Sequence, residues 1–318
     1  MFNTDIKSVV ELMDTFPDEA SCIKYLEQIR WAGTPVSPYD PDSKVYKLND
    51  GNYKCKNTQK KFNVRTCSMF GDTKMELRKW FLALWLVTGH KKGISSIQLG
   101  KDLGMTQKSA WFMLQRIRKC YFVENYNVLE GIIEADETFY GGKNKNRHNN
   151  KKFKQCSDRN FPDKIPIIGM IQRGGKMTAV VLKNTQRESI HPVIKEFVIE
   201  GSILHLDDWK AYRGLNEWYD HKTVKDASKG YINDYDPSVH TNNIEGAWKG
   251  FKNSARDMYN SVSKKHIQLY VDEFVFRYNL RKHSDSDKFN WLLLNSTTRT
   301  KYKDLIYEET QSKGCDCT

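Results

Sequence analysis

Acidic side chains stand at three places in this chain among apolar, glycine or aromatic neighbours. Asp136 and Glu137 follow one short apolar run, and Asp207 and Asp208 follow another. Glu245 lies farther along, in a segment with helical periodicity. Carboxylate oxygens are the ligands that hard divalent ions such as Mg²⁺ prefer, and two such ions can assist displacement at a phosphodiester. The residue types therefore indicate a metal-dependent site for phosphodiester chemistry, with these carboxylates as its candidate catalytic and metal-binding groups.

Each of the two acidic dipeptides leaves a choice open. Successive side chains of a strand point to opposite faces of a sheet, so only one of Asp136 and Glu137 can face the metal ions. The same holds for Asp207 and Asp208 if the strand continues through them. Periodicity alone does not show which carboxylate of each pair faces the metal ions. For any single carboxylate, the alternative interpretation is a solvated strand end or a helix cap.

The helix predicted around Glu245 carries a row of cations. Lys249, Lys252 and Arg256 follow Glu245 at spacings that place them on one helical stripe. Such a stripe suits a surface that follows a DNA backbone, because each cation can neutralise a phosphate. An ion pair within the helix would explain Glu245 and Lys249 but not the remaining cations.

Two tryptophans stand close in sequence to these acidic residues. Trp209 follows the second acidic pair, and Trp248 lies on the predicted helix of Glu245. Indole rings can stack on bases that leave the duplex, so both are candidate DNA contacts. Packing in the hydrophobic core is the alternative interpretation for each.

The composition of the chain indicates a polyanionic partner. Its 318 residues include 51 Lys and Arg against 39 Asp and Glu, which gives a net charge of +12 and a pI of about 9.2. Nucleic acid is the commonest partner for such a surplus, and an acidic membrane surface is the competing interpretation. No stretch approaches the roughly 18 consecutive apolar residues of a membrane-spanning helix, and the first residues lack the plan of a signal peptide. We therefore expect a cytoplasmic protein, and seven scattered cysteines argue against a disulfide framework.

The first third of the chain predicts helices and a small sheet. Two short amphipathic helices are expected in residues 1–33, and a two- or three-stranded ribbon in residues 34–72. Within residues 73–121, a helix over 95–103 is followed by a glycine turn and a second helix over 107–120. This order is typical of a helix-turn-helix DNA-binding domain, and an ordinary αα-hairpin is the alternative.

The second of these helices supplies candidate DNA contacts. Thr106 is its expected N-cap. Its apolar stripe, with Ala110 and Ile117, should be buried, whereas Lys108 and Arg116 should be exposed and able to reach DNA.

The largest block, residues 122–285, predicts a mixed α/β sheet flanked by helices. Residues after 285 are expected to form a C-terminal tail. The expected strands and helices of the block are strands over 128–135, 164–172, 176–182 and 202–206, and helices over 189–199, 242–258 and 263–282.

Three segments of this block resemble a known family. Residues 136–143 (DETFYGGK), 207–215 (DDWKAYRGL) and 240–248 (HTNNIEGAW) are similar to the motifs of ISXO-type bacterial insertion-sequence transposases, whose eukaryotic relatives are the Merlin transposons. The similarity extends over roughly residues 35–285. Several long motifs in the same order make this resemblance specific.

The resemblance implies an RNase H-like catalytic core with a DDE triad of Asp136, Asp207 and Glu245. It implies Mg²⁺ as cofactor, with Mn²⁺ able to substitute, and it adds Lys143 as a candidate DNA contact. The implied reaction is cleavage at transposon ends followed by transfer of the 3′-hydroxyl into target DNA. The implied partners are the double-stranded inverted repeats at the transposon ends, target DNA in the nucleoid, and further copies of the chain, as a homodimer or higher oligomer in a synaptic complex.

The chain departs from the family in its ribbon. Family members commonly carry a zinc ribbon with two Cys-x-x-Cys pairs, and the corresponding positions here are Ser37, Asp40, Cys55 and Thr58. A structural zinc ion needs four Cys or His ligands, so we predict a degenerate zinc-ribbon-like segment without zinc. Its apolar side chains should hold it together instead; these are Tyr46, Leu48, Tyr53 and Phe62.

Two other functions remain open from the sequence. An RNase H-like nuclease without strand transfer would keep the fold and the triad. A DNA-binding regulator derived from a transposase would act by occupying DNA and would not need the acidic residues.

Overall fold

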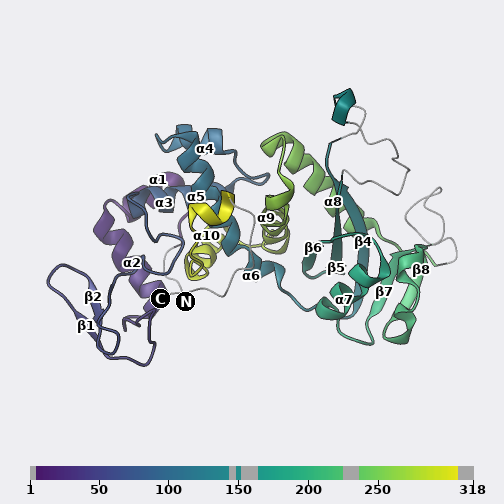
Figure 1. Ribbon diagram of the computed structural model, residues 1–318, viewed down its shortest axis with the longest axis horizontal. Helices are drawn as coiled ribbons and strands as arrows, with labels where there is room; N and C mark the ends of the chain where they lie inside the picture. Colours follow the sequence, from purple (N-terminus) through teal and green to yellow (C-terminus); the bar gives the residue numbers. More distant parts are fainter. Residues whose placement is uncertain (1–4, 143–147, 152–163, 225–235, 307–318) are drawn as a thin grey trace. The chain divides into compact units, whose positions relative to one another are not determined.

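A computed structural model of the chain describes residues 5–142, 148–151, 164–224 and 236–306 (Figure 1). Lys143, a predicted DNA contact, lies outside these residues. The chain forms two compact units. The N-terminal unit contains the residues up to Val123 together with those from Lys282 onward, and the central unit runs from Glu124 to Arg281.

The N-terminal unit is mainly helical. Its aromatic core includes Phe81 of α3, whose ring lies 5.5 Å from that of Phe289 in α10. Phe289 is fully buried, so the region expected to be a tail contributes a core helix. The helices of this unit are α1 (Val9–Thr15), α2 (Glu19–Trp31), α3 (Leu77–Gly89), α4 (Ser96–Asp102), α5 (Gln107–Cys120), α10 (Asp285–Leu294) and α11 (Tyr302–Ile306).

The α4 and α5 helices are joined by a turn at Gly104, which has a φ of +61°. Thr106 caps α5, because its Oγ1 accepts the backbone N–H of Ser109 at 3.3 Å. The predicted buried stripe of α5 is confirmed, since Ala110 and Ile117 are fully buried.

The prediction that Arg116 is exposed is wrong. Only 3% of this residue is accessible. Its guanidinium donates to the carbonyl oxygens of Met69 (3.0 Å), Gly71 (2.6 Å) and Thr300 (3.0 Å). A planar group with five donors satisfies several buried carbonyls at once, so Arg116 joins separate segments of the unit and does not present its charge to DNA. Lys108 is exposed as predicted.

Residues 45–62 form a three-stranded antiparallel sheet in the order β1 (Val45–Lys47), β2 (Tyr53–Cys55) and β3 (Lys61–Phe62). The rings of Tyr53 and Phe62 stack 5.8 Å apart and are buried, as predicted. Tyr46 was expected in the same core but is 43% exposed. It pairs with Lys54 across the strands, and alternation directs both side chains to the outer face.

Hydroxyl and thiol groups cluster beside this sheet at the positions compared above with zinc ligands. Ser37 and Cys55 are fully buried, and Ser37 Oγ accepts the backbone N–H of Asp40 at 3.3 Å. Burial acts to raise the pKa of the Cys55 thiol, but hydrogen bonds with the hydroxyls of Ser37, Ser43 and Thr58 lower it to about 6. Neighbouring protein atoms therefore satisfy these polar groups.

The central unit contains a mixed five-stranded sheet in the order β6-β5-β4-β7-β8 (Figure 1). Strands β4, β5 and β6 pair antiparallel, whereas β4, β7 and β8 pair parallel. Such a sheet flanked by helices is compatible with an RNase H-like fold. The strands are β4 (Ile132–Tyr140), β5 (Ile165–Gln172), β6 (Met177–Val181), β7 (Ile203–Asp207) and β8 (Asp220–Val224).

Helices cover both faces of this sheet. On one face, Ile133 and Leu204 form a core with Ile194 of α7. On the other face, Ile167 packs with Ile244 of α8 and with α9. These helices are α7 (Arg187–Phe197), α8 (Asn242–Ser254) and α9 (Ile267–Asn279), and the short α6 (Phe122–Asn125) contains the boundary between the two units.

Three features of the central unit differ from the prediction. Strand β4 begins at Ile132 and continues to Tyr140, so the first acidic pair lies inside the strand and not after it. The helix expected over 242–258 ends at Ser254, where a π-helical turn follows. Strand β8 was not predicted, because its sequence DHKTV is largely polar. In the described part of the chain, every helix is too short or too polar to span a bilayer.

The buried carboxyl of Asp272 in α9 generates a prediction about stability. Burial raises its pKa from the ordinary value of 3.8 to about 6, although the amides of Gln268 and Asn125 donate to it and act in the opposite direction. The folded state therefore holds this proton more tightly than the unfolded state does. The binding of this proton contributes fully to the free energy of unfolding below about pH 4. The contribution is lost as the pH rises through the pKa of the folded state.

Asp272→Asn removes this titration. We expect the free energy of unfolding of the variant, minus that of the wild type, to increase between about pH 4 and pH 6 and then to level off. Two pH units correspond to on the order of 3 kcal/mol. Urea denaturation of both proteins across this range measures the difference, and a difference independent of pH would contradict the prediction.

Candidate active site

The register of two parallel strands brings Asp136 and Asp207 side by side. Glu134 of β4 pairs with His205 of β7. Two residues farther along both strands, Asp136 and Asp207 occupy neighbouring positions at the same edge of the sheet. In-register residues of parallel strands share a face, so both side chains belong to the same side of the sheet.

Packing shows which member of the first acidic pair faces α8. Asp136 pairs with Gly169 of β5. A Cβ atom on Gly169 would lie 2.5 Å from the Trp248 ring and 2.9 Å from Ile244, both on α8. Asp136 therefore lies on the α8 face, and Glu137 lies on the opposite face.

Glu137 is placed beside an aromatic residue on that opposite face. Burial raises its pKa to about 7, while the phenol of Tyr212 lowers it and the charge of Asp207 raises it further. Tyr212 is fully buried. Glu137 therefore lies beside Tyr212 on the opposite face of the sheet, whereas Asp136 lies on the face covered by α8.

Helix α8 carries Glu245 into electrostatic range of the strand carboxylates. The pKa of Asp136 is raised well above its ordinary value, first by burial and then by the negative charges of Glu137, Asp207 and Glu245. Asp207 and Glu245, both singled out from the sequence, therefore lie within electrostatic range of Asp136. Mutual repulsion among these groups is the electrostatic setting in which a divalent cation is stabilising.

The chemistry of these donors fits Mg²⁺ better than a closed protein cage. Among the described residues, no group of three or more His, Cys, Asp or Glu side chains lies close enough together to hold a metal ion by itself. Mg²⁺ commonly uses one or two carboxylates, keeps several waters and takes further ligands from substrate phosphates. Asp136, Asp207 and Glu245 can supply that share of a coordination shell.

A fourth carboxylate, Glu134, lies on the same face as Asp136 but is fully buried. Its Oε1 accepts Arg173 Nε (2.8 Å) and Asn243 Nδ2 (2.7 Å). Its Oε2 accepts the backbone N–H groups of Asn243 (2.9 Å) and Ile244 (3.3 Å) at the start of α8. His240 Nδ1 lies 3.3 Å from Oε1. Glu134 therefore ties strand β4 to the first turn of the helix that carries Glu245.

Arg173, directly after β5, has further partners. Its Nη1 donates to the carbonyl oxygen of Ser238 (2.7 Å), and its Nη2 donates to that of His240 (3.2 Å). Nη2 also lies 3.1 Å from His205 Nδ1. Burial and the charge of Arg173 lower the pKa of His205, which favours the neutral ring that can accept this hydrogen bond. Arg173 does not stand out in the sequence, because Arg-Gly-Gly-Lys resembles an ordinary hairpin turn.

The side chains predicted as DNA contacts on and near α8 differ in their exposure. Lys249 and Lys252 are exposed. Arg256 is exposed in the π-helical turn and pairs with Asp257 at 3.0 Å. Trp248 is 3% exposed and packs in the core with Ile244, so its predicted stacking on bases is wrong and core packing holds. Trp209 is half-buried against the core on the α7 face.

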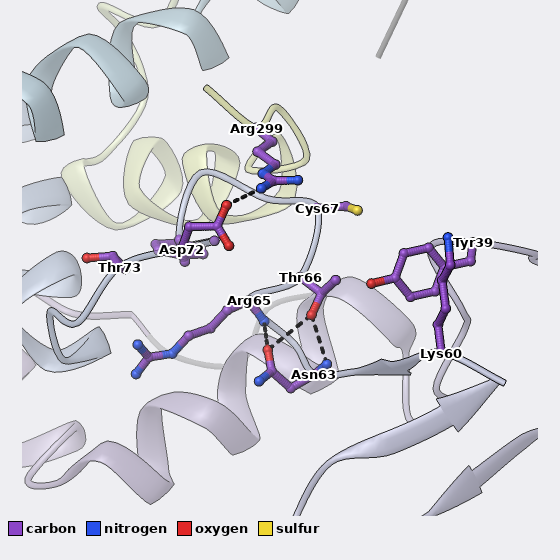
Figure 2. A pocket seen from close by; sticks show the side chains of 11 residues that line it. Tyr39, Lys60, Asn63, Arg65, Thr66, Cys67, Asp72, Thr73 and Arg299 are labelled. Carbon is purple, nitrogen blue, oxygen red and sulfur yellow. Dashed lines mark hydrogen bonds and ion pairs between the residues drawn. The ribbon is translucent and has the colours of Figure 1, made fainter. Parts of the chain in front are cut away.

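A polar cavity of about 660 Å³ lies in the N-terminal unit, beside the small sheet (Figure 2). Arg299 pairs with Asp72 there, and the Lys60 ammonium lies 5.1 Å from the Tyr39 ring centroid. Of the described lining residues, Asp72 is the acidic one. The cavity therefore lacks the set of carboxylates found at the sheet edge, where we place the candidate active site.

Comparison with known proteins supports this placement. Residues 128–279 match the ISXO2-like transposase domain. Over 276 residues, the chain is 25% identical to an uncharacterized protein in transposable element ISH50 of Halobacterium salinarum, covering 83% of this chain and 92% of that protein. An uncharacterized transposase-like protein of Haemophilus influenzae is 28% identical over 107 residues, or 33% of this chain and 81% of that protein.

The matched segment contains all three acidic positions of the candidate site. The resemblance to ISXO-type insertion-sequence transposases is confirmed by this match and by the similarity to the ISH50 protein. The match supports a transposase role for the protein.

The close approach of α8 to the sheet generates a test of this geometry. Gly169→Ala places a methyl group against Trp248 and Ile244. We expect a loss of about 1–3 kcal/mol in the free energy of unfolding, as is usual for overpacking, because the helix must move away from β5. Chemical denaturation measures this loss.

Gly250→Ala is the matched control on the same helix. Its Cβ would lie 3.6 Å from the Phe274 ring, an ordinary contact, and alanine is favoured over glycine in a helix by up to about 1 kcal/mol. The control should be neutral or stabilising. If Gly169→Ala were as stable as the control, α8 would not contact the sheet in this way.

Proposed function

We propose that the protein is a DDE transposase that binds the terminal inverted repeats of an insertion sequence and catalyses DNA cleavage and strand transfer. The observation that carries the proposal is that Asp207, on the strand next to that of Asp136, and Glu245, on α8, both lie within electrostatic range of Asp136. Mg²⁺ is the proposed cofactor, with Mn²⁺ able to substitute. The proposed place of action is the nucleoid.

The three carboxylates have one proposed task. They would hold divalent ions, which would supply Lewis acidity for displacement at the phosphodiester. The attacking oxygen belongs to water in cleavage and to the 3′-hydroxyl of the transposon end in strand transfer. Asp136 and Asp207 approach from neighbouring strands, and Glu245 approaches from α8, so the substrate phosphate would lie at this edge of the sheet.

DNA contacts are proposed for both units. In the central unit, exposed Lys249 and Lys252 on α8 would follow the phosphate backbone away from Glu245. In the N-terminal unit, α4 and α5 would act as a helix-turn-helix, with exposed Lys108 on the second helix. Synapsis of two transposon ends would require a homodimer or a higher oligomer.

We propose that the three-stranded segment is a degenerate zinc ribbon that works without zinc. Of the four corresponding positions, only Cys55 offers a thiolate, and hydroxyl groups surround it. Four Cys or His ligands, which a structural zinc ion needs, are not present at these positions.

The reaction can be tested with matched variants of one acidic pair. Asp207→Asn should lower the yield of joined product about 100-fold or more, since it removes a group that stabilises the transition state. Asp208→Asn, next in the chain, should stay close to wild type. Precleaved transposon ends, a target plasmid and Mg²⁺ provide the assay.

The same assay separates the alternatives. Cleaved ends without joined product from the wild type would favour a nuclease lacking strand transfer. Equal activity of Asp207→Asn and wild type in a cellular test of the biological effect would favour a DNA-binding regulator. Equal loss in both Asp variants would contradict the choice of Asp207.

The cations of α8 generate a prediction about DNA affinity. Each phosphate contact contributes about one to the slope of log affinity against log salt. We expect the double variant Lys249→Ala/Lys252→Ala to reduce this slope by about two. Fluorescence anisotropy with end DNA at several salt concentrations measures it. The control Lys176→Ala/Lys183→Ala removes the same charge from positions just before and just after β6. Equal slopes for both double variants would show that α8 does not follow the DNA.

A further inference from the structure

We infer that Arg173 is a positioning residue for the three carboxylates of the site. Its guanidinium lies at the junction of β4, which carries Asp136, β7, which carries Asp207, and the segment that leads into α8, the helix of Glu245. This inference rests on the proposed function of those carboxylates. It concerns how they are held and not what they bind.

The backbone delivers Arg173 to this junction. The residue follows β5 directly, and its N–H donates to the carbonyl oxygen of Ile132 at 2.9 Å. Gly174, with a φ of +72°, then starts the turn to β6. The side chain is 22% exposed, so most of the guanidinium is enclosed by the groups that it contacts.

Two of its contacts each lie two residues before a carboxylate of the site. Arg173 Nε donates to Glu134, and Asp136 follows Glu134 on the same face of β4. Arg173 Nη2 contacts His205, and Asp207 follows His205 on the same face of β7. Because side chains two apart on a strand point the same way, holding Glu134 and His205 fixes the register and twist of both strands at the site.

The remaining contacts fix the entry to α8. Arg173 donates to the carbonyl oxygens of Ser238 and His240, immediately before the helix. Glu134, which Arg173 neutralises, accepts the N–H groups of Asn243 and Ile244 in the first turn. A carboxylate at a helix N-terminus is favoured by the orphan donors and by the helix dipole. Glu245 follows within the same turn.

Glu134 itself is thereby excluded as a metal ligand. A carboxylate has about four lone-pair sites, and four hydrogen bonds from Arg173, Asn243 and Ile244 occupy them. The other acidic residue of β4 on this face is therefore committed to holding the helix, and its charge is matched by Arg173.

Lysine cannot replace Arg173 in this role. The guanidinium uses a planar fork to reach Glu134, His205 and two carbonyl oxygens at once, whereas an ammonium is a compact point charge on a flexible stem. Arg173→Lys keeps the charge and loses this geometry. Arg173→Ala loses both.

The test measures metal binding and strand transfer in parallel. Mn²⁺ binding to the full chain is followed by isothermal titration calorimetry, and joined product is followed as a function of Mg²⁺ concentration. Loss of a group that orients metal ligands typically weakens metal binding about 10–100-fold. We expect Arg173→Lys and Arg173→Ala to raise the Mn²⁺ dissociation constant and the half-saturating Mg²⁺ concentration by this factor.

Lys176→Ala is the matched control. Lys176 lies in the same hairpin and pairs with buried Glu124 at 2.9 Å, so the control also removes one cation from a buried carboxylate. It should leave both metal constants at their wild-type values.

The outcomes separate the inference from the proposed function. If the wild type binds Mn²⁺ and both Arg173 variants bind it equally well, Arg173 is not a positioning residue and the proposed function stands. If the variants have a lower melting temperature but an unchanged Mn²⁺ dissociation constant and half-saturating Mg²⁺ concentration, Arg173 only stabilises the fold and the inference is wrong. Should Arg173→Ala fail to fold, circular dichroism reveals it and Arg173→Lys decides. A wild type that neither binds Mn²⁺ nor joins DNA would overturn the proposed function and the inference with it.

Discussion

The parallel pairing of β4 with β7 is the constraint on which the candidate site depends. It places Asp136 beside Asp207 although the chain between them forms two strands and a helix. Like charges at neighbouring positions repel, and burial makes this repulsion more costly. Other interactions must therefore stabilise this edge of the sheet against the repulsion. The apolar cores on its two faces and the bonds of Glu134 to α8 provide that stabilisation.

Helix α8 combines two roles that make opposite demands on its sequence. Its inner side must approach the sheet closely, which Gly169 permits by leaving room for the Trp248 ring. Its outer side presents Lys249 and Lys252 to solvent. Glu245 lies between these sides and is half-buried. The direction of its carboxylate therefore follows from how the helix is seated, which explains why polar contacts concentrate at the first turn.

Local pattern was enough to predict the strands β5, β6 and β7 and the buried stripe of α5, because their apolar periodicity is strong. Strand β8 was not predicted, because its polar sequence has no strand pattern and only its pairing with β7 makes it a strand. Arg116 and Arg173 occupy positions that look exposed in sequence, yet carbonyl groups remote along the chain enclose them. The acidic positions could be named from sequence. The choice of Asp136 over Glu137 as the residue facing α8 required the packing of both sheet faces.

The contribution of α10 to the N-terminal unit has a consequence for biosynthesis. Phe289, Leu292 and Leu293 are fully buried there, in contact with helices that the ribosome produces much earlier. Domains generally fold in the order of their synthesis, but this one lacks part of its interior until α10 has been synthesised. A nascent chain that stops before α10 would therefore expose apolar surface on its proposed DNA-recognition region, and only polypeptides that include α10 would present that region in its finished form.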